Sequence, residues 1–77
     1  MRTLKEIKEY LKNAKTEELV SKRGNKYQVV RIDKKLFKKV FTFKSLIVGH
    51  HEVNNEIIYP VSWFEKGKRN EVIIANK

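Results

Sequence analysis

The sequence contains no cysteine, one proline and three glycines. The absence of cysteine excludes disulfides, thiolate metal sites and cysteine catalysis. Long hydrophobic stretches are also lacking, since no run approaches the ~20 apolar residues that span a bilayer. Residues 1–6 mix apolar, basic and acidic side chains and contain no apolar signal-peptide core. We therefore expect a soluble, cytoplasmic protein that makes no membrane contact.

Enzyme motifs are lacking as well. The chain has no glycine-rich phosphate loop, no nucleophile elbow and no paired-carboxylate pattern. His50 and His51 are adjacent, so on a strand they point to opposite faces and do not easily share one metal ion. Glu52 and Glu56 flank Asn54-Asn55, where a solvated hairpin end explains them. We expect a non-catalytic protein with no metal and no cofactor.

Positive charge is concentrated in one segment. Residues 21–44 hold nine basic residues against one acid, a local charge of +8 in a chain of net charge +9. Residues 49–77 hold four basic and four acidic residues and are neutral. A concentrated positive field attracts polyanions and speeds their encounter. The nine candidate nucleic-acid contacts are Lys22, Arg23, Lys26, Arg31, Lys34, Lys35, Lys38, Lys39 and Lys44.

The N-terminal segment predicts a helix over residues 3–14. Thr3 and Glu6 match the capping-box pattern, in which each side chain accepts a hydrogen bond from the other residue's backbone N–H. Leu4, Ile7 and Leu11 then recur at helical spacing. Because its apolar residues lie on one side, this helix must pack on an apolar surface.

Most of the remaining chain predicts antiparallel strands. Gly24-Asn25 suits a hairpin turn between strands at 19–23 and 26–33, and Asn54-Asn55 suits a type I′ turn between strands at 46–53 and 56–64. Pro60 indicates an edge strand or a bulge in the second hairpin. A turn at 66–69 and a last strand at 71–75 complete the pattern.

Residues 36–43 are ambiguous between helix and strand. Leu36, Phe37, Val40 and Phe41 have helical spacing, and Asp33 is a suitable N-cap. Residues 40–43 are β-branched or aromatic throughout, which favours a long strand, and we predict a strand here. Such a strand would place Lys38 and Lys44 on one face, beside basic residues of the preceding hairpin.

The predicted fold is one α+β domain covering residues 1–77. An N-terminal amphipathic helix packs on a twisted antiparallel β-meander of five to six strands. A strongly bent meander of this size can close partly into a small SH3-like barrel, an expectation by analogy of fold alone.

Aromatic residues near the C-terminus are candidate partner contacts. Trp63 and Phe64 point to opposite faces of a strand, so one belongs to the core and the other is exposed. Tyr59 shares the face of Trp63. Exposed aromatics often anchor protein interfaces, so Tyr59, Trp63 and Phe64 are the candidate partner-binding residues.

Three functional hypotheses follow. The first is non-catalytic binding of nucleic acid, DNA or RNA, through the basic segment, in a phage or mobile-element protein. Lysines outnumber arginines there, which favours non-specific contact over reading of base edges. The second is a small protein-binding module or inhibitor that docks on an acidic or nucleic-acid-binding surface of a host protein. The third is a ribonuclease toxin with dispersed catalytic residues. The oligomeric state stays open.

Overall fold

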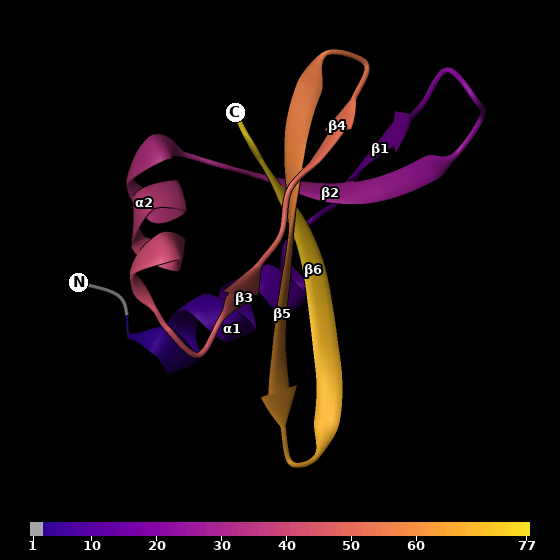
Figure 1. Cartoon of the computed structure of the whole chain (residues 1–77). Helices are drawn as coiled ribbons and strands as arrows, with labels where there is room; N and C mark the ends of the chain where they lie inside the picture. Colours follow the sequence, from indigo (N-terminus) through magenta and orange to yellow (C-terminus); the bar gives the residue numbers. More distant parts are fainter. Residues whose placement is uncertain (1–2) are drawn as a thin grey trace.

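The computed structural model describes residues 3–77 and has the predicted α+β architecture, with a helix at the N-terminus followed by strands (Figure 1). Two helices and six strands form over these residues. In chain order they are α1 (Leu4–Asn13), β1 (Glu17–Val20), β2 (Lys26–Ile32), α2 (Lys34–Thr42), β3 (Ile47–Val48), β4 (His51–Val53), β5 (Glu56–Glu65) and β6 (Lys68–Asn76).

The sheet has the strand order β1-β2-β6-β5-β3, and β4 pairs with β5 next to β3. The β1–β2, β4–β5 and β5–β6 hairpins and the β3–β5 pair are antiparallel, but β2 and β6 pair in parallel. The parallel pair arises because α2, β3 and β4 lie between β2 and the β5–β6 hairpin and return the chain to the side of β2. The sheet is therefore mixed and open, and the parallel β2–β6 pair is where it departs from the predicted antiparallel meander.

α1 confirms the N-terminal prediction. Thr3 is the N-cap, and both hydrogen bonds of the capping box with Glu6 form. Ile7 and Leu11 are fully buried against the sheet, whereas the lysines of this helix lie on its outer faces. The helix therefore depends on tertiary packing, as expected for so short a segment.

The predicted strand at residues 36–43 is wrong, because the chain forms α2 there. The Asp33 side chain accepts a hydrogen bond from the backbone N–H of Leu36 at 2.8 Å and caps the helix. Val40 is completely buried, and Leu36 and Phe37 pack beside it. Burial of this helical stripe and the cap outweigh the β propensity of the C-terminal residues. The predicted basic sheet face through Lys38 and Lys44 therefore does not exist.

Pro60 interrupts the neighbouring strand instead of placing β5 at an edge. β5 lies between β6 on one side and β3 with β4 on the other. The Gly49 N–H donates to the Pro60 carbonyl at 2.8 Å, but proline has no N–H to return. This missing bond separates β3 from β4.

Asn54 and Asn55 both have positive φ in the predicted turn that follows β4.

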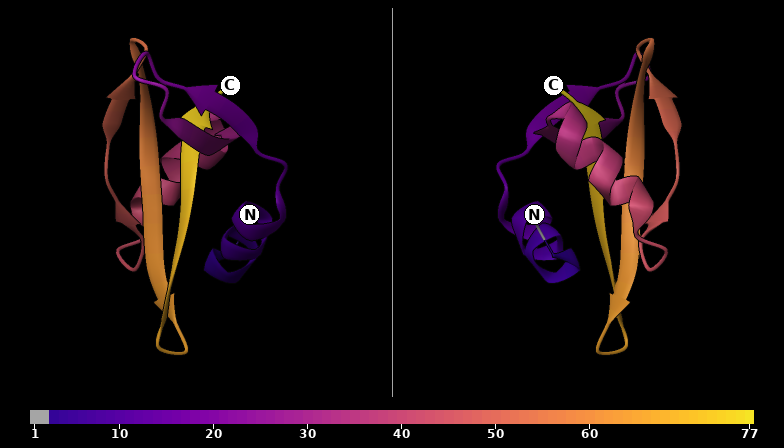
Figure 2. Two further views of the ribbon diagram at one scale, coloured as in Figure 1. Left: turned by 90° about the vertical axis from the view of Figure 1, so that its right-hand side faces the viewer. Right: turned by 90° about the vertical axis from the view of Figure 1, so that its left-hand side faces the viewer.

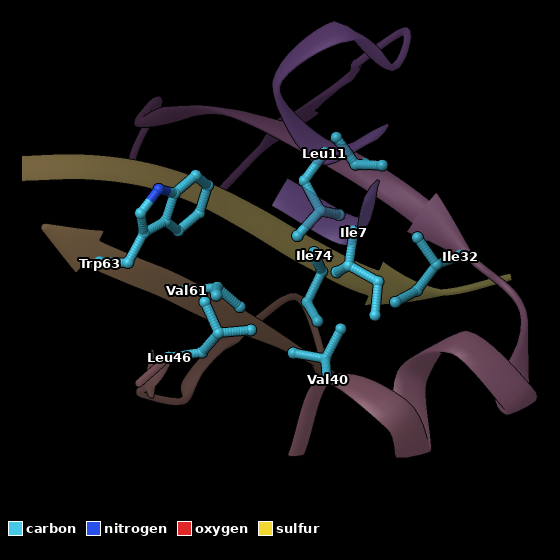
Figure 3. Close-up of a cluster of buried hydrophobic side chains, with 9 residues drawn as sticks. Ile7, Leu11, Ile32, Val40, Leu46, Val61, Trp63 and Ile74 are labelled. Atoms are coloured by element: carbon cyan, nitrogen blue, oxygen red, sulfur yellow. The ribbon is translucent and has the colours of Figure 1, made fainter. Parts of the chain in front are cut away.

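The core has two parts, one on each face of the sheet. The larger part lies between the sheet and the helices, where Ile7 and Leu11 of α1 and Val40 of α2 approach Ile74 of β6 (Figure 3). Trp63 belongs to this part and is 1% exposed. The smaller part, on the opposite face, consists of Val29, Val53, Ile58 and Ala75.

Candidate nucleic-acid interface

Helix α2 carries the densest unpaired positive charge in the described structure. It contains four lysines and no acid, and no acidic residue occurs from residue 34 to residue 51. None of these lysines, nor Lys44 just after the helix, forms an ion pair with any residue from 3 to 77. The exposed side of the helix is therefore a free cationic surface.

Aromatic rings lie among these lysines. Phe37 and Phe41 are one helical turn apart with ring centroids at 4.9 Å. Tyr59 of β5 meets both rings edge-on, at 4.8 Å from Phe37 and 5.6 Å from Phe41. Phe41 is 49% exposed, because its position on α2 lies beyond the buried stripe. We call Phe37, Phe41 and Tyr59 the aromatic trio.

An open hollow of about 710 Å³ lies beside the trio, between α2 and the C-terminal end of β6. Phe37 and Phe41 form its apolar part, and Lys34, Lys38 and Lys77 line it as well. Asp33 also lines the hollow, but its carboxylate is engaged in capping α2. We call the hollow, its three lysines and the aromatic trio the α2 surface.

Arg31 serves a structural role and is not a free cation. Its Nε donates to Glu17 Oε2 at 2.7 Å, and its Nη2 donates to Glu56 Oε1 at 3.0 Å. Nη1 donates to Glu56 and to the Asn76 carbonyl. Arg31 thus connects β1, β5 and β6. The carboxylates of Glu17 and Glu56 and the Asn76 carbonyl compete with any phosphate for its guanidinium.

The ion pairs of Arg31 make the free energy of unfolding depend on pH. The hydrogen bond from Arg31 holds the pKa of Glu56 below its usual range. A carboxyl with a lowered folded pKa contributes stability above its unfolded pKa of about 4.3, and that contribution is lost as the pH falls through the folded pKa.

We therefore expect the melting-temperature difference between the wild type and Glu56→Gln to be largest near pH 7 and to shrink below about pH 4. Thermal melts monitored by circular dichroism across this range test the prediction. A difference that stays constant down to about pH 2.5 would show that the Glu56 charge does not contribute.

The remaining predicted basic contacts are divided between the β1–β2 hairpin and α2. Lys22 and Arg23 occupy the β1–β2 loop, and Lys26 begins β2. In Figure 1 this loop and α2 lie on opposite sides of the sheet. Lys35 and Lys39 lie on α2, and the Lys39 ammonium is 5.6 Å from the centre of the Phe43 ring. The single basic segment of the sequence therefore becomes two separate surfaces.

The predicted aromatic contacts separate as well. Trp63 is in the core, and its Nε1 donates to Glu65 at 3.1 Å, so a partner does not reach it in the folded protein. Phe64 is 65% exposed on the face without helices. Tyr59 is half-buried in the aromatic trio. The aromatic trio was not predicted from the sequence, although the four-residue spacing of Phe37 and Phe41 would place both rings on one side of a helix.

The two histidines also differ in their surroundings. His51 contacts Tyr27 of β2, with ring centroids 5.7 Å apart, whereas His50 lies in the exposed link between β3 and β4. Across residues 3–77, no group of three or more His, Asp or Glu side chains is placed to hold a metal ion. Within the same residues, neither helix is long and apolar enough to cross a membrane.

Comparisons of the chain with protein families, with curated proteins and with solved structures find no match.

Proposed function

We propose that this protein is a non-catalytic nucleic-acid-binding protein that contacts single strands of DNA or RNA through its α2 surface. The observation that supports the proposal best is the half-exposed Phe41 ring within the aromatic trio, surrounded by lysines that have no acidic partner. Single-strand binders combine such a cationic surface with aromatic rings on which bases stack.

The chemistry of the surface favours binding without sequence specificity. Its cations are Lys34, Lys38 and Lys77, whose ammonium groups attract phosphates as point charges. A stacked base presents the same kind of π-face whatever its identity, so Phe41 adds affinity but little selectivity. A duplex keeps its bases stacked internally and offers Phe41 no such face.

Phe41→Ala tests the stacking contribution. Loss of one stacked base costs about 1–3 kcal/mol, so we expect affinity for a labelled single-stranded oligonucleotide to fall about 5- to 150-fold. Affinity for a duplex of the same length should change little. Fluorescence anisotropy at low salt measures both.

Phe64→Ala is the matched control, because it removes an exposed aromatic ring that lies away from the α2 surface. It should leave oligonucleotide affinity unchanged. Equal losses in the two variants, or no loss in Phe41→Ala, would contradict a stacking role for the trio.

A second function, docking on an acidic host protein, is favoured by a different observation. Phe64 of β5 and Ile47 of β3 are 65% and 58% exposed and lie on the sheet face without helices. Exposed apolar side chains gathered on one face often mark a protein interface, and the net charge of +9 favours an acidic partner. In that case Phe64→Ala should abolish complex formation with the partner, and Phe41→Ala should not.

A further inference from the structure

The ends of two hairpins meet at one end of the molecule, away from α2. The β1–β2 loop and the β4–β5 turn both lie at the top of Figure 1 and stay close in both views of Figure 2. β2 and β4 are separated by two strands, so in a flat sheet they would be about 14 Å apart. The Tyr27 and His51 rings nevertheless lie 5.7 Å apart, which shows that the sheet curls at this end.

Hydrogen bonds hold the two hairpin ends together. The Asn54 side-chain amide donates to the Val20 carbonyl at 2.7 Å, which joins the β4–β5 turn to β1. Tyr27 Oη lies 3.3 Å from His51 Nε2, which joins β2 to β4. Below these contacts Val29, Ile58 and the rest of the smaller core are buried. The arrangement is therefore supported by packing as well as by polar contacts.

A cleft of about 390 Å³ lies between the hairpin ends. That volume is within the range of small-ligand sites. The Tyr27 and His51 rings line it, together with Lys22 and Arg23, neither of which forms an ion pair with a described residue. Glu52 is the acidic residue in the lining, so two cations face one anion.

The loop that carries the two cations has a defined shape. Gly24 has a φ of +87°, which an L side chain rarely adopts. The Ser21 N–H donates to the Asn25 carbonyl at 2.8 Å, and the Asn25 N–H donates to Ser21 Oγ at 3.0 Å. The closed loop therefore fixes the backbone of Lys22 and Arg23 at the mouth of the cleft.

We propose that this inter-hairpin cleft binds a nucleoside phosphate. Lys22 and Arg23 hold the phosphate, because an unpaired guanidinium and ammonium are the side chains that bind phosphate oxygens most strongly. The tilted Tyr27 and His51 rings contact the base, and the Asn55 amide and the Asn54 Oδ1 face its polar edge. The proposal does not depend on nucleic acid binding at the α2 surface.

Titration with uridine 5′-monophosphate, followed by NMR of backbone amides, tests the cleft in the intact protein. We expect shifts confined to residues 21–27 and 51–55, and weaker shifts with uridine alone or inorganic phosphate alone. No shift at these residues up to millimolar nucleotide, or shifts only at α2, would overturn the proposal.

Paired substitutions separate this site from the α2 surface. Lys22→Ala with Arg23→Ala removes two charge-assisted contacts, so the nucleotide affinity should fall at least about tenfold. Lys34→Ala with Lys38→Ala should retain it. Unchanged amide spectra away from the mutated positions establish that both variants are folded. Wild-type nucleotide affinity in the first variant would overturn the proposal, whereas weak oligonucleotide binding in the second concerns the α2 surface alone.

The phosphate group can come from a free nucleotide or from a nucleic-acid strand. Comparing uridine 5′-monophosphate with the dinucleotide UpU, whose only phosphate is a diester, distinguishes the two sources. Tighter binding of the monophosphate assigns the cleft to a free or terminal nucleotide, and equal or tighter binding of UpU assigns it to a strand. If the cleft residues respond to neither, the proposal fails.

Discussion

Trp63→Ala should remove a large part of the protein's free energy of unfolding and lower its melting temperature steeply. Trp63 is 1% exposed and is the largest fully buried side chain among the described residues. Its removal leaves a cavity in the larger part of the core and should cost about 3–5 kcal/mol. A chain of this length has a total stability of roughly 4–12 kcal/mol, so the loss takes a large part of it.

Thermal and urea unfolding monitored by circular dichroism measure the effect. Phe64→Ala is again the matched control, because its ring is 65% exposed and its removal should change the stability by no more than about 0.5 kcal/mol. Equal melting temperatures for Trp63→Ala and the wild type would contradict the described core. A large loss in Phe64→Ala would mean that the open sheet face is covered in solution.

The difference in burial between Trp63 and Phe64 was only partly predictable from the sequence. Strand alternation predicts that Trp63 and Phe64 point to opposite faces, and this is confirmed. Alternation alone does not say which face is inside. That depends on where the helices lie, and α2, which covers the face of Trp63, was predicted as a strand.

Local signals predicted the elements whose stability is local. The capping box of Thr3 and Glu6 and the positive-φ turn of Asn54-Asn55 depend on residues close in sequence, and both predictions are confirmed. α2 also had local signals, the Asp33 cap and the helical spacing. They were outweighed in the prediction by the β propensity of residues 40–43, a weak preference that packing overrides.

Non-local contacts could not be predicted. Arg31 meets Glu17 and Glu56, which lie 14 and 25 residues away in the chain. These contacts of Arg31 depend on the parallel pairing of β2 with β6, and no sequence pattern indicates that pairing. From the sequence alone, the nine basic residues are therefore predicted to form one patch. In the fold, Arg31 forms ion pairs, and the other eight are divided between two sides of the sheet.

Charge reversal on α2 should produce the largest loss of nucleic-acid binding. Lys34→Glu with Lys38→Glu removes two cations beside the aromatic trio and adds two repulsive charges. Each phosphate contact to a single strand contributes a factor of about five at roughly 0.1 M salt, so the two lost contacts alone should weaken binding about 25-fold. Repulsion by the new carboxylates adds to this loss.

Lys66→Glu with Lys68→Glu is the matched control, because it changes the net charge equally. These lysines lie at the β5–β6 turn, at the opposite end of the sheet from β4 (Figure 1). The control should lose affinity only through the weak, screened effect of net charge. Equal losses in the two variants would mean that binding responds to overall charge and not to the α2 surface.

The salt dependence of oligonucleotide binding by the wild type is the decisive measurement for nucleic-acid binding at the α2 surface. A labelled single strand is titrated by fluorescence anisotropy at several salt concentrations, and the logarithm of the binding constant is plotted against that of the salt concentration. Contacts of Lys34, Lys38 and Lys77 with about three phosphates predict a slope of about −2, and Lys34→Glu with Lys38→Glu should bring it to about −0.7. No detectable binding at low salt, or a slope near zero, would contradict the proposal that this protein binds nucleic acid through its α2 surface.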